Sequence, residues 1–136
     1  MKDINIKFIP QERQRYAVAG QIGDYWETET AIEFRVTEFD DPVYSMAVLM
    51  HELHEKFRNN MLGIKDEDVD LFDLLHAEVD DCGVLPDAPY HKTHMEADAI
   101  ERLFILLCGE DWTKYEEAAT VEIDRFLDIE EAKKGC

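Results

Sequence analysis

The chain has 136 residues, and its composition limits what it can do. Thirty-two Asp and Glu residues outweigh fourteen Lys and Arg residues, which gives a net charge of −18 at pH 7. This charge disfavours direct binding to nucleic acid or to an anionic membrane surface. Because 46% of the residues are hydrophobic and the chain has the length of one domain, we expect a single globular domain over residues 1–136.

The cysteines and the apolar segments bear on the cellular compartment. Cys82, Cys108 and Cys136 are odd in number and form no C-x-x-C pair, which is typical of reduced thiols. The sequence has neither the pattern of a signal peptide nor an apolar run long enough for a membrane span. We therefore expect a cytoplasmic protein that has no membrane contact.

The first 39 residues have the alternating pattern of β-strands. Ile4, Ile6 and Phe8 alternate with polar residues, and residues 31–39 alternate in the same way. Further strand candidates are residues 16–19 and 21–26, with a hairpin connection at residues 27–30. The pattern predicts a small antiparallel sheet over residues 1–39, one face of which is exposed to water.

Residues 40–132 are predicted to be helical, so the expected fold class is α+β, with the sheet packed on about four helices. The first helix has Asp41 as its N-cap, Pro42 at its first position and Gly63 as its stop. The others are expected from residue 66 to 77 or 78, from 90 to 108, and from 111 or 113 onward.

The first helix contains His51-Glu52-Leu53-His54-Glu55. The spacing of His51 and Glu55 brings two side chains onto one metal ion, and the motif differs from the H-E-x-x-H zinc signature only in its second ligand. Glu52 then lies near the ion, where it can act as the general base that activates water. An i,i+4 hydrogen bond within a charged cluster is the alternative interpretation. Apolar residues share the stripe of His51 and Glu55, which favours a protein-lined space: Tyr44, Val48 and Leu62.

A second histidine-bearing segment opens the third helix. His94 lies at the end of a mostly apolar stripe and is the expected third ligand. Two histidines and a carboxylate suit a divalent ion, with zinc expected first and iron or manganese as alternatives. His54 points away from His51 and Glu55, so we expect it to be a packed side chain. Candidates for a fourth ligand, or for a group that orients a ligand, are Asp73, Asp98, Glu101 and His91.

The acidic residues permit two other hypotheses. Glu52-x-x-Glu55 together with Glu78-x-x-Asp81 resembles the magnesium-binding pattern of all-α nucleotide pyrophosphatases. The excess of negative charge also suits an interaction protein that imitates nucleic acid and inhibits a basic host partner.

Taken in order, the motifs resemble a group of small phage- and prophage-encoded proteins whose activity is not established. The matching pieces are H-E-L-x-E at 51–55, Gly63-Ile64, V-D-x-F-D at 69–73, Ala88-Pro89-Tyr90 with His94, Glu101-Arg102-Leu103 and G-E-D-W at 109–112. The resemblance covers roughly residues 22–115 and implies a phage origin, and with it the cytoplasm of a host cell. Strands that precede a His-Glu helix are also similar in layout to minimal zincin-like metallopeptidases.

The sequence thus favours a metal-binding protein. If the protein is an enzyme, we expect metal-dependent hydrolysis of a small-molecule or peptide substrate. The sequence does not indicate whether the hydrolysed bond is a peptide, an amide or a phosphoester. A metal ion that only joins two helices is the structural alternative.

Overall fold

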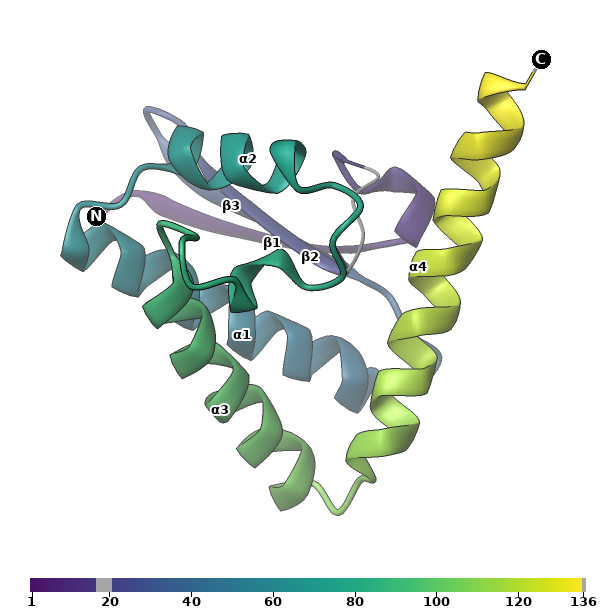
Figure 1. The fold of residues 1–136 in the computed structure, drawn as a ribbon. Coiled ribbons are helices and arrows are strands. Elements are labelled where there is room, and N and C mark those ends of the chain that lie inside the picture. Colours follow the sequence, from purple (N-terminus) through teal and green to yellow (C-terminus); the bar gives the residue numbers. More distant parts are fainter. Residues whose placement is uncertain (17–20, 136) are drawn as a thin grey trace.

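The computed structural model describes residues 1–16 and 21–135 and contains a three-stranded sheet followed by four α-helices (Figure 1). The strands are β1 (Asp3–Ile9), β2 (Gly23–Glu27) and β3 (Ala31–Thr37). The helices are α1 (Pro42–Leu62), α2 (Asp66–Leu75), α3 (His91–Leu107) and α4 (Trp112–Lys134). Two short 3-10 turns are η1 (Gln11–Arg13) and η2 (Cys82–Val84). The predicted α+β class, with an N-terminal sheet on four helices, is confirmed.

The sheet is mixed, whereas the sequence pattern predicted an antiparallel one. Strand β3 lies in the centre, with β2 antiparallel on one side and β1 parallel on the other. Strand β3 is inserted between β1 and β2, so β1 pairs with β3 in parallel and not with β2, its neighbour in the sequence. Alternation of side chains indicates which face of the sheet a residue occupies, but it does not indicate whether the neighbouring strand is parallel or antiparallel. The strand candidate at 16–19 falls mainly on residues 17–20, outside the described residues.

Helix α1 begins and ends as predicted from its flanking residues. The carboxylate of Asp41 accepts a hydrogen bond from the backbone N–H of Val43 at 2.9 Å, and Pro42 occupies the first turn. Gly63 ends the helix in the left-handed conformation, with φ at 72°. Helix α2 ends at Leu75, before the predicted limit, because His76 leaves the helical conformation with φ at −118°.

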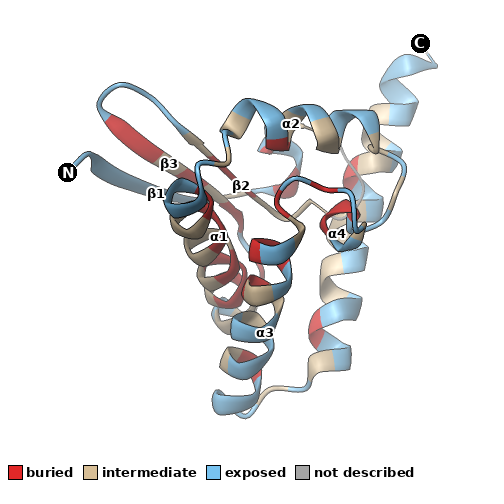
Figure 2. Cartoon of the chain, turned by 60° about the vertical axis from the view of Figure 1, so that its left-hand side comes forward, coloured by how far each residue is buried: buried red, intermediate tan, exposed pale blue. Residues whose placement is uncertain are grey.

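The core lies between the sheet and α1, and α3 and α4 close it (Figure 2). Phe34 and Val36 of β3 are fully buried against Val48 and its neighbours on α1. One side of α1 therefore faces the sheet, while another side packs against α3. Leu62, which was predicted to belong to the inward stripe, is exposed at the end of the helix.

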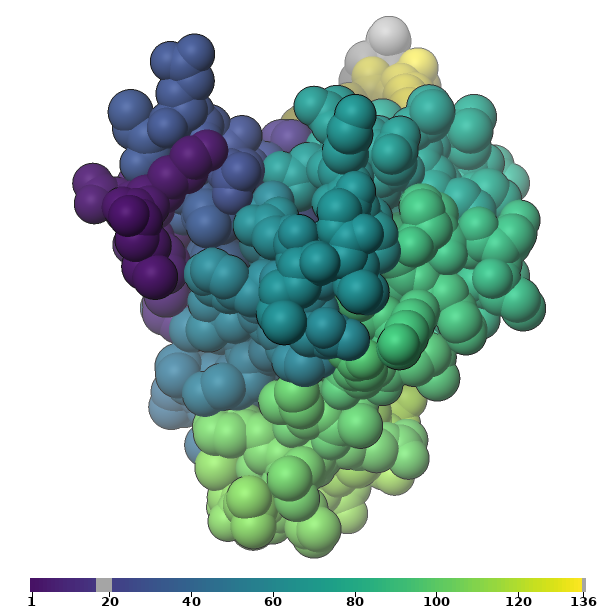
Figure 3. Space-filling model, turned by 90° about the vertical axis from the view of Figure 1, so that its left-hand side faces the viewer, coloured from purple at the N-terminus to yellow at the C-terminus, as the bar shows by residue number. Residues whose placement is uncertain are grey.

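Helix α2 and the loop after it cover the beginning of α3. In Figure 3 the teal atoms around α2 lie between the N-terminal strands, in purple and blue, and the green atoms of α3. Helices α3 and α4 diverge from the short connection at 108–111 (Figure 1). Within the described residues, no helix combines the length and the apolar character that a membrane crossing requires.

Candidate metal centre

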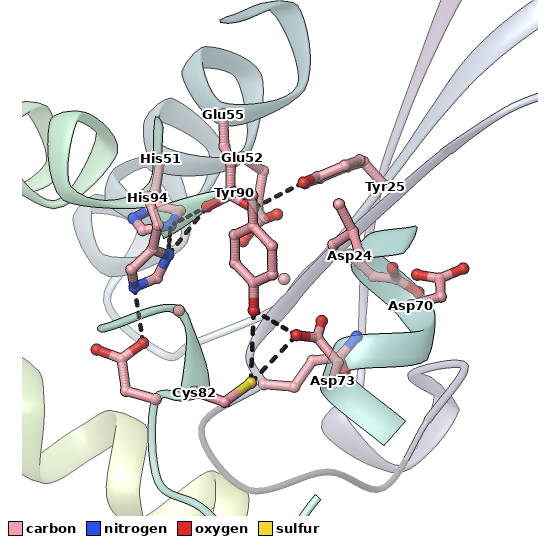
Figure 4. Close-up of a pocket in the computed structure, with 15 residues that line it drawn as sticks. Asp24, Tyr25, His51, Glu52, Glu55, Asp70, Asp73, Cys82, Tyr90 and His94 are labelled. Carbon is pink, nitrogen blue, oxygen red and sulfur yellow. Dashed lines mark hydrogen bonds and ion pairs between the residues drawn. The ribbon is translucent and has the colours of Figure 1, made fainter. Parts of the chain in front are cut away.

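Two residues of α1 and one of α3 meet where these helices pack (Figure 4). Nε2 of His51 lies 3.0 Å from Oε2 of Glu55, as the i,i+4 spacing predicts. Nδ1 of His94 lies 3.0 Å from the same oxygen and 3.2 Å from Nε2 of His51. All three side chains are buried, with 4–8% of each residue exposed. Three donor atoms therefore form a small triangle inside the protein.

The size of this triangle matches the spacing of ligands around one ion. Ligand atoms at about 2.0–2.1 Å from zinc in a tetrahedral site are separated by about 3.3 Å. The three sides of the observed triangle measure 3.0, 3.0 and 3.2 Å. One divalent ion can therefore contact all three atoms with only small movements of the side chains.

Asp98 offers a second carboxylate to the same pair of histidines. Donor atoms of His51, His94 and Asp98 lie within 4.8 Å of one another, which makes these residues a potential metal-binding group. Oδ1 of Asp98 is 3.3 Å from Nδ1 of His51, and Oδ2 is 3.6 Å from Nε2 of His94. Glu55 and Asp98 thus approach different nitrogens of each imidazole.

Nδ1 of His51, the ring nitrogen that does not face Glu55, is held by a carboxylate. It lies 2.7 Å from Oε1 of Glu101, whose other oxygen accepts a hydrogen bond from the hydroxyl of Tyr115. This arrangement favours the tautomer of His51 in which Nδ1 carries the proton and Nε2 is free to bind a metal. Metal-binding histidines are commonly oriented by a carboxylate in this way.

A chain of buried hydrogen bonds holds Glu55. The hydroxyl of Tyr25 donates to Oε1 of Glu55 at 2.7 Å and accepts from the amide of Asn59 at 2.9 Å. Thr93 of α3 donates to the amide oxygen of Asn59 at 2.6 Å. The chain joins β2, α1 and α3, so the same contacts that dock these elements fix the direction of the Glu55 carboxylate.

The loop after α2 holds the ring of His94. A Cβ atom on Gly83 would lie 2.5 Å from Cγ of His94, so only glycine allows this close approach. Nε2 of His94 is buried and lies 2.8 Å from Oδ1 of Asp81, so a carboxylate of the same loop contacts the ring nitrogen that does not face Glu55.

The electrostatic field of the site favours positive charge. Burial lowers the pKa of His94, but Asp81 and Glu55 outweigh burial and raise it to about 10. Burial likewise opposes protonation of His51, and Asp98, Glu101 and Glu55 still raise its pKa well above the ordinary value. Burial raises the pKa of Glu55, yet its contacts with the two histidines lower it to about 2. A field that stabilises protonated imidazoles also attracts a divalent cation.

Glu52 lies beside this triangle and lines two cavities. Its side chain packs on Gly23, where an added Cβ would approach the Glu52 carboxylate to 2.6 Å. Burial and the neighbouring Glu55 raise the pKa of Glu52 well above its usual range. Glu52, His51 and His94 line both a cavity of about 80 Å³ beneath α2 and one of about 630 Å³ between α3 and α4.

The other histidines and Asp73 make separate contacts. Nδ1 of His91 hydrogen-bonds the carbonyl of Gly83 at 3.1 Å. His54 lies 2.9 Å from Glu96 and remains outside the triangle, as expected from the helical spacing. Asp73 accepts hydrogen bonds from Tyr90 and Cys82 and lines the smaller cavity.

The residues of the pyrophosphatase-like pattern are not all on helices. Glu52 and Glu55 lie on α1, whereas Glu78 and Asp81 follow the end of α2 in turns. The N-terminal sheet also differs from an all-α architecture. The arrangement therefore does not favour the all-α pyrophosphatase hypothesis.

Sequence reasoning included Glu101 among its candidates but missed the other residues that support the three donor atoms. Asn59 follows Glu55 by one helical turn, so its position on the inward stripe was a usable signal. Long-range packing brings three further residues to the site from other elements: Tyr25, Gly83 and Tyr115. The sequence around each of them does not predict these contacts.

We compared the chain with protein-family models, with curated proteins and with solved structures, and none of these comparisons found a match.

Arg15 joins β2 to α2 at the edge of the smaller cavity. Nε of Arg15 lies 2.9 Å from Asp24, and Nη2 lies 3.1 Å from Asp70. Burial raises the pKa of Asp70 to about 6, with the nearby Asp24 and other acids adding to the effect and Arg15 opposing it. Ionised Asp70 is therefore less favourable in the folded than in the unfolded chain.

The replacement Tyr25→Phe tests the chain of hydrogen bonds at Glu55. It leaves Oε1 of Glu55 and the side-chain N–H of Asn59 without this partner, so we expect unfolding to become easier by about 1–3 kcal/mol. Any metal affinity should fall by about 10- to 100-fold, because the ligand loses its orienting contact. Urea unfolding and metal titration measure the two effects. Tyr44→Phe is the matched control, because the hydroxyl of Tyr44 makes no hydrogen bond with the described residues; an equal loss in both variants would contradict the assignment.

The replacement Asp70→Asn tests the electrostatics of the α2 edge. A raised carboxyl pKa means that the folded state binds its proton more tightly, so the parent loses stability as the pH rises from about 4 to about 6. Asp70→Asn lacks this titration, so its free energy of unfolding should rise relative to the parent over that window and stay level above it. Urea unfolding at several pH values measures the difference. A difference that is independent of pH from 4 to 7 would contradict the raised pKa.

Proposed function

We propose that His51, Glu55 and His94 bind one divalent metal ion and that the protein is a metal-dependent hydrolase. The observation that carries the proposal is the triangle of donor atoms with sides of 3.0–3.2 Å. A divalent cation between these atoms would replace the protons that the two imidazoles otherwise share with the carboxylate. The contacts made by Glu101 and Tyr25 on the outer sides of the ligands support the same interpretation.

Glu55 is the better carboxylate ligand than Asp98. It is almost fully buried, and its second oxygen is already fixed by Tyr25. The side chain of Asp98 is 33% exposed, and its distances to the ring nitrogens are longer. We assign Asp98 to the edge of the site, where it neutralises charge or binds as a further ligand.

Two nitrogens and one oxygen at near-tetrahedral spacing suit zinc best, and iron or manganese accept the same set. The His51 and His94 side chains border both cavities, so a fourth coordination position would be open to a substrate. A bound metal supplies Lewis-acid chemistry, which polarises a carbonyl or phosphoryl oxygen and makes water more acidic. An open position favours a catalytic role over a purely structural one.

Glu52 is the proposed general base. It is next to His51 in the chain, it lines both cavities, and within the described residues no hydrogen bond holds its carboxylate. The positive charge of a bound divalent ion would favour the ionised form of Glu52, which would then take a proton from the attacking water and return it to the leaving group. Gly23 makes room for this side chain, and any larger residue there would displace it.

The cavity above His51 favours a hydrolase over the acidic interaction protein, because a decoy of nucleic acid needs no enclosed space beside two histidines. The resemblance of the motifs to phage and prophage proteins supports a phage origin and action in the host cell. We also propose that the whole chain forms one domain, because the sheet and three of the helices share one core.

Elemental analysis of untagged protein tests the metal site. We expect about one equivalent of zinc, iron or manganese in the parent, lost in His51→Ala, His94→Ala and Glu55→Gln. His54→Ala removes a histidine of the same helix outside the site and should keep the metal. Asp98→Asn should also keep it. Loss in Asp98→Asn with retention in Glu55→Gln would assign the other carboxylate, and a parent that binds none of the ions would refute the site.

The replacement Glu52→Gln tests the general base in metal-loaded protein. With a panel of peptides, amides and phosphoesters, we expect the rate to fall by about 10²- to 10⁴-fold while the metal content stays unchanged. Glu116→Gln, a neutralised acid in the wall of the larger cavity, should change the rate only slightly. Full activity of Glu52→Gln would exclude the proposed role. A loaded parent that cleaves no member of the panel would favour a metal that only joins the helices.

A further inference from the structure

The larger cavity extends from the histidine pair along the space between α3 and α4. Its volume of about 630 Å³ lies within the usual range for small-ligand sites. His51, Glu52 and His94 line one part of it, and Arg102 and Trp112 line another. The remaining wall contains apolar side chains from several elements, including Ile22, Val48, Ala99, Ala119 and Ile123. A ligand in this cavity would meet the proposed metal, an apolar wall and one cation.

Arg102 is a preorganised and unpaired cation. Its guanidinium carbon lies 4.6 Å from the centre of the Trp112 ring, which holds the side chain over the indole. Within residues 1–16 and 21–135, no carboxylate oxygen lies within 4.0 Å of its nitrogens. Four other arginines of this acidic chain have such partners, namely Arg15, Arg35, Arg58 and Arg125, whereas Arg13 has none among the described residues but does not line the cavity. An arginine left free beside a cavity is available to an anionic ligand.

The position of Arg102 sets its distance from the reacting centre. Asp98, which contacts both histidines, precedes Arg102 by four residues on α3. Four residues correspond to about 6 Å along a helix, and both side chains lie on the same face. One extended residue spans about 3.3–3.6 Å. An anion held by Arg102 would therefore lie one or two residues from a bond placed at the histidines.

We infer that the substrate is an amide with an apolar group and a free terminal carboxylate, and that Arg102 binds this carboxylate. The inference rests on the proposed metal-dependent hydrolysis. The amide bond nearest the carboxylate would lie at His51 and His94, with the apolar side chain against the wall of the cavity. Arginine binds carboxylates through two parallel hydrogen bonds, which would also fix the orientation of the substrate.

The charge of the cavity favours a carboxylate over a phosphate. Arg102 is the sole Lys or Arg in the described lining, whereas six acidic residues share that lining: Glu52, Asp80, Asp81, Asp98, Glu101 and Glu116. A phosphate ester with two negative charges would be repelled by these acids about twice as strongly as a singly charged carboxylate. One guanidinium can compensate a single charge but not two.

Paired thiol probes test the inference by binding, without turnover. Mercaptoacetyl-phenylalanine joins a metal-binding thiolate to an apolar side chain and a free carboxylate, and its carboxamide lacks only the charge. With zinc-loaded protein in calorimetric titrations, we expect the carboxylate to bind at least tenfold more tightly than the carboxamide. Arg102→Gln should remove this preference and leave the affinity for the carboxamide unchanged. Arg125→Gln, which neutralises an arginine of α4 paired with Glu12 and Glu122, is the control and should keep it.

The outcomes separate the inference from the proposed function. Equal binding of both probes by the parent, or a preference that survives in Arg102→Gln, would overturn the role of Arg102 while the metal site stands. Binding of neither probe by zinc-loaded protein would overturn this inference, while the metal content of the same sample decides the metal site separately. A phosphonate version of the probe provides a further comparison: weaker binding than the carboxylate supports the charge argument, and tighter binding overturns it.

Discussion

The buried carboxylate of Glu55 is the constraint on which the packing of α1, α3 and β2 depends. An ionised carboxylate inside a protein is strongly unfavourable unless charge and hydrogen bonds compensate it. Here a hydroxyl from β2 binds one oxygen, and imidazoles from α1 and α3 approach the other. These compensating groups come from three elements, so the elements must dock correctly for the charge to be tolerated. Folding and formation of the site are therefore the same event in this part of the molecule.

Local signals predicted the helices and part of the site. Asp41, Pro42 and Gly63 define α1 because capping depends on residues within one turn of the helix end. His51 and Glu55 face the same direction because helical geometry fixes the relation between positions four apart. The prediction that His94 joins them needed only one further assumption, that the third helix packs on the first. The structure brings these three side chains together, and each of the inferences depended on periodicity rather than on the global topology.

The rest of the site depends on contacts between distant segments, which the sequence does not encode locally. The parallel pairing of β1 with β3 depends on the order of the strands in the sheet, which the alternation of side chains does not indicate. In the same way, Tyr25 reaches Glu55 from a strand, and Tyr115 reaches Glu101 from a different helix. Spacing alone did not distinguish which of Asp98, Glu101 and Asp73 would contact the histidines. The structure shows that Glu101 contacts His51, whereas Asp73 accepts a hydrogen bond from Tyr90.

The net charge of −18 is unevenly distributed over the structure. Several of the carboxylates line the two cavities and surround the histidine pair, so the negative potential is concentrated where low dielectric walls strengthen it. Such a cavity attracts a divalent cation and rejects ligands with several negative charges. A single anionic group can still enter beside Arg102, because the guanidinium is held over Trp112 away from any carboxylate. The same distribution of charge would therefore serve both the proposed metal site and the proposed selection of a singly charged substrate.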